Sequence, residues 1–356
     1  MTRDLAKWAT WSEILAQPEI WAGWAGTLDL AAAHDFVAAA GVDEVWFSGA
    51  GTSAYVGDIL TATLDCPSGL RFRSVPTTDL VARPDMIRGR RPLVVNFGRS
   101  GNSAETIGTL DILDAVAPDA PRVNVTCNGD SALATRKGAG PQHVVVLPAA
   151  THDAGFAMTS SFSTMLLTAL AVFGQDGTRP ITRAAAILHD LLPRLTAFAA
   201  DRTPPERIVF LGSGPLTYAA RESALKVMEL AAGQIPALWD STLGFRHGPK
   251  SFVRGATDVV LFLSPDAHAR RYDDDLAAEL RAQFPAARVT TLGPGGDVDL
   301  PMPDGAGWAA ANAVALAQVL AVHWSDALGL NVDNPFEGQG TLTRVVSGVR
   351  LYPVAA

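Results

Sequence analysis

Two short loops gather small hydrogen-bond donors where apolar runs end. The first reads Gly-Ala-Gly-Thr-Ser at 49–53, and the second reads Gly-Arg-Ser-Gly-Asn-Ser at 98–103. Glycines let the backbone approach a ligand closely, and the free N–H groups of a helix start favour an anion. The two loops therefore predict a seat for a phosphate monoester, although serine and threonine are also ordinary helix N-caps.

A second feature is a charged stripe on an otherwise apolar helix predicted at 221–234. Glu222, Lys226 and Glu229 fall on one face, because residues three and four apart return to the same side of a helix. One interpretation is a Glu–Lys pair on a narrow solvent face. The other is a cleft wall, where partial burial and the lysine separate the pKa values of the two carboxylates and leave Glu229 fit to move protons.

A third candidate is His247, which stands between Arg246 and a Gly-Pro pair in a loop that we expect to open a helix. The cations Arg246 and Lys250 beside it favour the neutral imidazole. A lone histidine is more often structural than catalytic, and the remaining histidines show no metal-type spacing.

Composition excludes several classes of protein. The chain has 356 residues, 48% of them hydrophobic, and a net charge of −8, which argues against nucleic acid or an anionic membrane as the main partner. Its most apolar stretch, 308–324, is interrupted by Asn312 and Gln318 and is expected to be too short to cross a bilayer. No signal peptide is expected, and Cys66 and Cys127 are predicted to be reduced core thiols. We predict a cytoplasmic protein.

Both common nucleotide-binding patterns fit poorly. The loop at 49–53 lacks the third glycine of the dinucleotide fingerprint, because the next glycine, Gly57, comes six residues after Gly51. Neither loop is followed by the lysine of a phosphate-binding P-loop.

The elements that must position these residues alternate between short apolar runs and helical stretches, which predicts parallel sheets covered on both faces. The expected strands are 44–49, 71–75, 92–98, 122–127, 143–147, 207–212, 235–240, 258–264 and 288–293. Helices are expected within residues 1–40, at 159–173, up to about 200 and at 306–328, with a linker at 173–183.

A faint internal repeat relates the two halves. Residues 45–55 resemble residues 208–218 at an offset of 163, and each segment reads as strand, Gly-x-Gly and helix. The second half lacks a counterpart of the loop at 98–103. We therefore predict two similar α/β halves with a single hydroxyl-rich pocket.

Taken together, the segments "SGAGTS", "GRSGNSAET", "RESALKVMEL" and "RHGP" resemble the SIS (sugar isomerase) superfamily. The stretches "VPTTDLV", "THDAGFAMTSSFSTM", "WDSTLGFRHGPKSF" and "NVDNP" are more specifically similar to the AgaS family. This resemblance implies an α/β fold of two tandem SIS domains, each a doubly wound, mainly parallel sheet flanked by helices. The expected division is an N-terminal helical segment (1–40), two domains (41–185 and 195–340) and a C-terminal tail (341–356).

The resemblance also implies roles for individual residues. Catalysis would fall to Glu229, which moves a proton between C1 and C2, to Lys226 in the same pocket, and to His247, a ring-opening residue lent by the neighbouring subunit. The residues implied in binding phosphate or sugar are Gly51, Thr52, Ser53, Ser100, Gly101, Asn102, Ser103, Thr159 and Ser160. The C-terminal ring-opening lysine of the better understood relatives has no counterpart in this tail.

The implied activity is that of a deaminase and isomerase of amino sugar metabolism. It would convert D-galactosamine 6-phosphate to D-tagatose 6-phosphate and ammonia in a shared-site homodimer, as a hydrolase that needs no metal or organic cofactor. Two alternatives stay open: ketose–aldose isomerisation of tagatose 6-phosphate or a related hexose 6-phosphate without deamination, and a phosphosugar sensor without catalysis.

Overall fold

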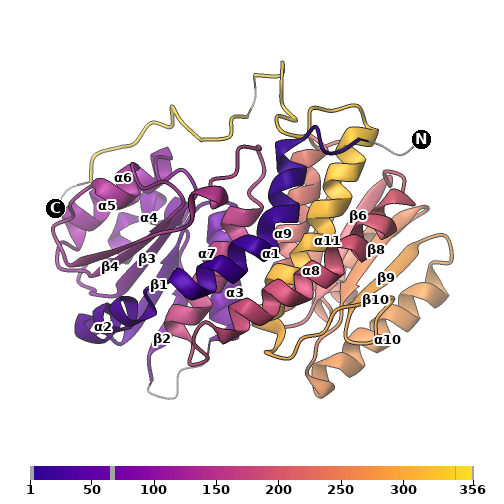
Figure 1. Ribbon diagram of the computed structural model, residues 1–356, viewed down its shortest axis with the longest axis horizontal. Coiled ribbons are helices and arrows are strands. Elements are labelled where there is room, and N and C mark those ends of the chain that lie inside the picture. The colour runs from indigo at the N-terminus through magenta and orange to yellow at the C-terminus, as the bar shows by residue number, and fades with distance from the viewer. Residues whose placement is uncertain (1–3, 65–68, 341, 355–356) are drawn as a thin grey trace.

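Two parallel sheets organise the computed structural model, which describes residues 4–64, 69–340 and 342–354. The strand order is β2-β1-β3-β4-β5 in the first sheet and β10-β9-β8-β6-β7 in the second, and every pairing is parallel. Figure 1 shows the two sheets on either side of a central group of helices.

The strands of the first sheet are β1 (Glu44–Ser48), β2 (Arg71–Ser74), β3 (Leu93–Gly98), β4 (Arg122–Thr126) and β5 (Gln142–Val146). Those of the second are β6 (Arg207–Gly212), β7 (Ala237–Ser241), β8 (Thr257–Phe262), β9 (Arg288–Gly293) and β10 (Val298–Asp299). The helices of the first half are α1 (Ala9–Thr27), α2 (Leu30–Ala40), α3 (Thr52–Thr63), α4 (Thr77–Ala82), α5 (Ala104–Val116), α6 (Ala132–Thr135) and α7 (Ser160–Phe173). The others are α8 (Arg179–Ala200), α9 (Pro215–Leu230), α10 (Ala267–Gln283) and α11 (Ala306–Ala327).

The core lies mainly between the sheets. One continuous apolar cluster joins the inner faces of both sheets to the central helices α3, α7, α9 and α11. A second cluster lies between the second sheet and α10, and a third lies between the first sheet and α4 and α5. Helices therefore cover both faces of each sheet, which is why central strands such as β1, β3 and β8 are buried at every position.

The internal repeat is visible in the backbone. Each sheet places the first strand of its half beside the second and third, in the same order. Gly51 and Gly214 precede α3 and α9 with nearly the same dihedral angles, φ 54° and ψ −128° against φ 57° and ψ −130°. Side chains rarely adopt this conformation, so a glycine is required at both positions. The predicted fold of two tandem doubly wound α/β domains is confirmed.

Several sequence expectations need correction. The predicted linker at 173–183 is shorter, because α8 already begins at Arg179 with Pro180 in its first turn, where proline is well tolerated. The short strand β10 was not expected. The helix predicted after His247 is a pair of short 3₁₀ turns, Gly244–His247 and Pro249–Phe252, separated by Gly248 at φ 131°.

The length argument for the apolar stretch at 308–324 was also wrong. Helix α11 has 22 residues and is long and apolar enough to cross a membrane, but 94% of that apolar window is buried within the protein. Asn312 lies inside and donates a hydrogen bond to the Ala184 carbonyl at 2.9 Å. Cys127 is a buried free thiol, and Cys66 lies outside the described residues.

Candidate active site

A cavity of about 210 Å³ opens at the carboxyl ends of β1 and β3. This edge is where parallel α/β sheets bind ligands, because helix starts and loops converge there. Its lining combines both phosphate-type loops, one residue of α9, the segment before α7 and part of the C-terminal tail. The lining residues that enter the argument are Gly51, Thr52, Ser53, Arg99, Ser100, Gly101, Ser103, Phe156, Met158, Glu229 and Arg344.

A positive φ in the first loop, and a positive φ together with close packing in the second, require glycine. Gly51 ends the first loop at a positive φ and caps α3. Gly101 in the second loop has φ 63°, and a Cβ there would lie 2.4 Å from the Ser131 hydroxyl. Both loops therefore need glycine to bring the starts of α3 and α5 to the cavity, where their N–H groups favour a negative charge.

The hydroxyl groups predicted to bind phosphate differ in their present partners. Ser103 caps α5 by accepting from the Thr106 N–H at 3.3 Å, and the Ser100 hydroxyl accepts from the Asn102 N–H at 3.3 Å. An accepting serine oxygen keeps its own proton for a ligand. Ser53 instead donates to the sulfur of Met158 at 3.8 Å. Ser100 thus keeps its proton for a ligand, and Ser103 does so when the Thr106 hydroxyl is the donor in the 2.8 Å hydrogen bond that the two side chains share.

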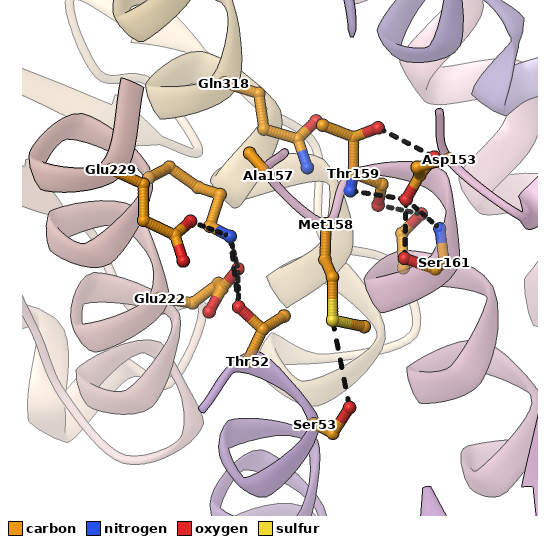
Figure 2. Close-up of polar contacts among 12 residues, drawn as sticks. Thr52, Ser53, Asp153, Ala157, Met158, Thr159, Ser161, Glu222, Glu229 and Gln318 are labelled. Atoms are coloured by element: carbon orange, nitrogen blue, oxygen red, sulfur yellow. Dashed lines mark hydrogen bonds and ion pairs between the residues drawn. The ribbon is translucent and has the colours of Figure 1, made fainter. Parts of the chain in front are cut away.

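The charged stripe of α9 reaches the cavity from the second half of the chain. Lys226 lies 2.6 Å from Glu229 and 3.2 Å from Glu222, and its ammonium donates to the Thr52 hydroxyl at 3.0 Å. Thr52 in turn donates to Glu222 at 3.2 Å. Figure 2 shows the two carboxylates converging with Thr52 at this point. Thr52 therefore joins the first phosphate-type loop to the charged helix.

Burial and charge set the protonation states of this group. Burial raises the pKa of Glu222 to about 7, with Lys226 opposing the rise and Glu229 adding to it. Burial by itself would lower the pKa of Lys226, but Glu222 and Glu229 outweigh it and raise the pKa above its usual value. Lys226 is therefore a buried ammonium. Because one oxygen of Glu229 meets this ammonium, the other can face a substrate in the cavity.

Five of the predicted site residues do not line the cavity. Lys226 lies behind Glu229 with its side chain fully buried. Asn102 is exposed, and its amide oxygen accepts from the Ala132 N–H at 2.8 Å. His247 is exposed on the second half.

The other two, Thr159 and Ser160, are fully buried. Thr159 donates its hydroxyl to Asp153 at 3.0 Å, and Ser160 donates to the same carboxylate at 2.5 Å. In Figure 2 these contacts surround Asp153 at the start of α7. Their hydroxyl protons therefore serve the helix start, and a role in sugar binding stays a prediction.

Sequence reasoning missed part of the cavity wall. Phe156 and Arg344 line it, and Arg99, noted only as part of the second loop, lines it too. The one available signal was charge, since Arg344 is the sole basic residue between 331 and 349. Its guanidinium donates to the Asp153 carbonyl. Among the residues that the structure describes, no group of three or more His, Cys, Asp or Glu side chains could hold a metal ion.

Two parallel five-stranded sheets flanked by helices agree with a protein built from SIS domains. A SIS domain model matches residues 40–174. Over 96% of its length the chain is 41% identical to an AgaS protein of Streptomyces coelicolor, which it covers to 94%. The chain belongs to the AgaS family, and it is an enzyme of the phosphosugar isomerase and deaminase type.

Two further relatives bear on the chemistry. The D-galactosamine-6-phosphate deaminase AgaS of Escherichia coli O157:H7 is 40% identical over 86% of this chain and 84% of its own. The crystal structure of tagatose-6-phosphate ketose/aldose isomerase from Escherichia coli is 34% identical, with a TM-score of 0.87 over 100% of this chain and 99% of that one. Proteins described as a deaminase and as a ketose/aldose isomerase are thus both similar to this chain.

Proposed function

We propose that the protein converts D-galactosamine 6-phosphate and water to D-tagatose 6-phosphate and ammonia. The observation that carries the proposal is that Ser100, Ser103 and Glu229 line one cavity, although they come from different halves of the chain. One hexose phosphate could then contact the phosphate loops and the carboxylate together. The choice of substrate is supported by the similarity to AgaS relatives that are described as D-galactosamine-6-phosphate deaminases.

The phosphate would bind at the starts of α3 and α5, with Ser100 and Ser103 donating to it. A dianion there gains from the N–H groups and from both helix dipoles. The buried ammonium of Lys226 lies behind this seat and holds the Glu229 carboxylate at 2.6 Å. The phosphate thus fixes one end of the sugar while Glu229 meets the other, which is how positioning lowers a barrier.

The chemical step would use Glu229 as a single acid–base group. In the open-chain aldehyde, Glu229 takes the proton from C2, and the electron pair forms the C1–C2 double bond while the π pair of the C1 carbonyl moves to O1, which takes a proton from water, so that an enolamine results. Glu229 then returns its proton to C1, and the amino nitrogen releases a proton to water as the C2–N double bond of the imine forms. Water then adds to C2, the C–N bond breaks, and ammonia leaves with the ketose phosphate. Atoms and charge balance without an oxidant.

Ring opening is assigned to His247 of a neighbouring subunit in a homodimer. Two observations support this part of the proposal. His247 is exposed and does not line the cavity of its own chain. Met228 and Leu243, which are close in sequence to Glu229 and His247, are 40% and 47% exposed, as expected of a surface that a second copy covers. We place this dimer in the cytoplasm.

Mixing variants tests the shared site. Glu229→Gln and His247→Asn homodimers should each be nearly inactive. If every site takes Glu229 from one chain and His247 from the other, a 1:1 mixture refolded together should regain about a quarter of wild-type activity, because half the dimers carry one intact site. A mixture that stays inactive, with heterodimers verified by mass, would place both residues in the same chain's site.

Product analysis tests the reaction. We expect the purified enzyme to release ammonia from D-galactosamine 6-phosphate in a coupled assay, with D-glucosamine 6-phosphate as the comparison substrate. The similarity to tagatose-6-phosphate ketose/aldose isomerase favours a second candidate, in which the same C1–C2 proton transfer acts on tagatose 6-phosphate. Aldose formation without ammonia would favour that candidate. Thermal stabilisation by the sugar phosphates without any turnover would favour a sensor.

A further inference from the structure

Arg99 belongs to the second phosphate-type loop, yet its guanidinium is directed at main-chain carbonyls. Its Nη1 donates to the carbonyls of Gly155 at 3.0 Å and Ala157 at 3.3 Å. Its Nη2 donates to those of Phe156 at 3.1 Å and Arg344 at 3.2 Å. A basic residue in this position invites assignment as a phosphate ligand, but these contacts point elsewhere.

The number of N–H donors on Arg99 limits what its guanidinium can bind. A guanidinium carries four N–H groups on its two Nη atoms and one on Nε. The four carbonyls take all four Nη donors of Arg99, whose residue is only 6% exposed. A bidentate grip on phosphate would need two of these donors, and buried carbonyls would then lose their partners, which is costly.

The four carbonyls belong to two segments that wall the cavity. Residues 153–158, here called the wall loop, contribute Phe156 and Met158 to the lining, and the C-terminal tail contributes residues 343–346. Arg99 is thus a single cation that ties both segments to the phosphate loop. The wall loop and the tail come from distant parts of the sequence, and neither residues 153–158 nor residues 342–354 form a helix or a strand.

The wall loop is fixed at its N–H groups as well. Glu13 accepts from the N–H groups of Ala154 at 2.5 Å and Gly155 at 3.3 Å, and the Phe156 N–H donates to the Asp333 carbonyl at 2.9 Å. With the Arg99 contacts, the loop is bonded on both sides of its backbone. Such bonding fixes the backbone that carries Phe156 at the cavity wall.

We propose that Arg99 is a positioning residue, which holds the wall loop and Arg344 against the phosphate loop and does not contact the substrate phosphate through its Nη atoms. This inference rests on the proposed use of the cavity for a sugar phosphate. The phosphate is bound by the serine hydroxyls and helix starts, whereas Arg99 determines where Phe156 and Arg344 meet the sugar.

Two substitutions separate positioning from phosphate binding. Arg99→Lys keeps the charge but has one nitrogen, which cannot reach four carbonyls, and Arg99→Met removes the charge. We expect both to lower kcat by about 10- to 100-fold, because small displacements of positioning groups have effects of that size. The inhibition constant of inorganic phosphate should change less than about threefold in both.

A phosphate ligand would behave differently. Lysine would then largely rescue binding, whereas methionine would weaken inhibition by phosphate more than about tenfold. That pattern, or a normal kcat in Arg99→Met, would overturn the proposal. Ser100→Ala is the matched control, because it should weaken phosphate binding and leave the wall loop in place.

Hydrogen exchange gives a readout that depends on neither turnover nor the choice of sugar. Amides 154–156 should exchange at least about tenfold faster in both Arg99 variants than in wild type or Ser100→Ala. If neither variant folds, hydrogen exchange of the wild-type protein with added inorganic phosphate still tests the proposal. Inorganic phosphate should leave exchange in the wall loop unchanged or slower, and faster exchange would mean that phosphate draws Arg99 away. Failure of galactosamine 6-phosphate as a substrate would leave this test intact.

Discussion

The two halves share a backbone but fill the same sheet edge differently. In the first half α3 begins with Thr52 and Ser53, and in the second half α9 begins with Pro215 and Leu216. Further along, α3 carries Ile59 and Thr63 where α9 carries Glu222 and Lys226. In the proposed function, the phosphate donors thus lie on one copy, and the charged groups assigned to catalysis lie on the other.

The second half also holds its own anions at that edge. Asp273 of α10 is fully buried and accepts from the hydroxyls of Ser213 at 2.7 Å and Thr242 at 2.6 Å, and from the Ser264 N–H at 2.8 Å. The first half has Leu110 at the position 163 residues earlier. An internal carboxylate therefore satisfies donors in the second half that a ligand would satisfy in the first.

The caps of the matching helices follow the same division. Ser103 caps α5, and Asp266, 163 residues later, caps α10 by accepting from the N–H groups of His268 and Ala269. A neutral cap leaves the helix dipole free to attract a ligand anion, whereas a carboxylate already neutralises it. The second half therefore meets the donors of this edge with its own acids, the buried Asp273 and the exposed Asp266, on a similar backbone.

The largest effect should come from the group that the second half lends to the first. Glu229→Gln should lower kcat by about 10²- to 10⁴-fold, because it removes the only carboxylate assigned to proton transfer. Inhibition by inorganic phosphate should persist, since the phosphate loops are intact. Steady-state kinetics would check this, with the exposed Glu206→Gln as control. Near-normal turnover would remove Glu229 from the mechanism.

The next effect should fall on stability. Asp273→Ala removes the carboxylate that accepts from the buried Thr242 hydroxyl, the half-buried Ser213 hydroxyl and the Ser264 N–H, so we expect a loss of about 2–4 kcal/mol in the free energy of unfolding. Denaturant unfolding would measure it, and Asp275→Ala, an exposed position on the same helix, should be close to neutral. KM of the folded enzyme should not change. A large rise in KM would show that the second sheet edge also takes part in binding.

Much of this division could be predicted from local sequence. Strand β3 is buried at all of its positions, and Glu229 stands out because it belongs to a charged stripe on a helix whose other faces are mainly apolar. Gly51 could be recognised from the Gly-x-Gly spacing that follows a predicted strand. These features depend on periodicity and on near neighbours, which a sequence displays directly.

The rest depends on contacts between distant segments. Arg344 reaches the cavity through an irregular tail, and such a segment has no period that would predict which groove it follows. Thr159 and Ser160 have hydroxyl groups of the kind that bind sugars, but both hydroxyls donate to the Asp153 carboxylate in the structure. A serine or threonine after an acid is ambiguous in sequence, because the same groups serve helix starts and ligands.

A smaller effect, on KM, should distinguish the loop at 98–103 from the corresponding edge of the second sheet. Ser100→Ala should raise KM about tenfold with kcat within about twofold, because a hydrogen bond to a charged phosphate strengthens ground-state and transition-state binding alike. Ser213→Ala removes a hydroxyl at the corresponding edge of the second sheet, where it already serves Asp273, and it should lower stability without changing KM. Equal KM effects in the two variants would contradict the assignment of phosphate to the first half.

The smallest effect concerns acids beside the open cavity. Burial raises the pKa of Glu13 to about 7, and Asp153 adds to the rise. A carboxyl whose folded pKa exceeds its unfolded value of 4.5 binds a proton on folding between those values, so its contribution to stability falls as pH rises through that window.

Glu13→Gln keeps an oxygen for the wall-loop N–H groups and removes this dependence. Its melting temperature should exceed that of the wild type by about 2–4 °C at pH 8, with the difference shrinking toward pH 5. Glu19→Gln, exposed on the same helix, should show no such trend. A Glu13→Gln difference independent of pH would mean that burial and Asp153 do not disfavour the charge of Glu13.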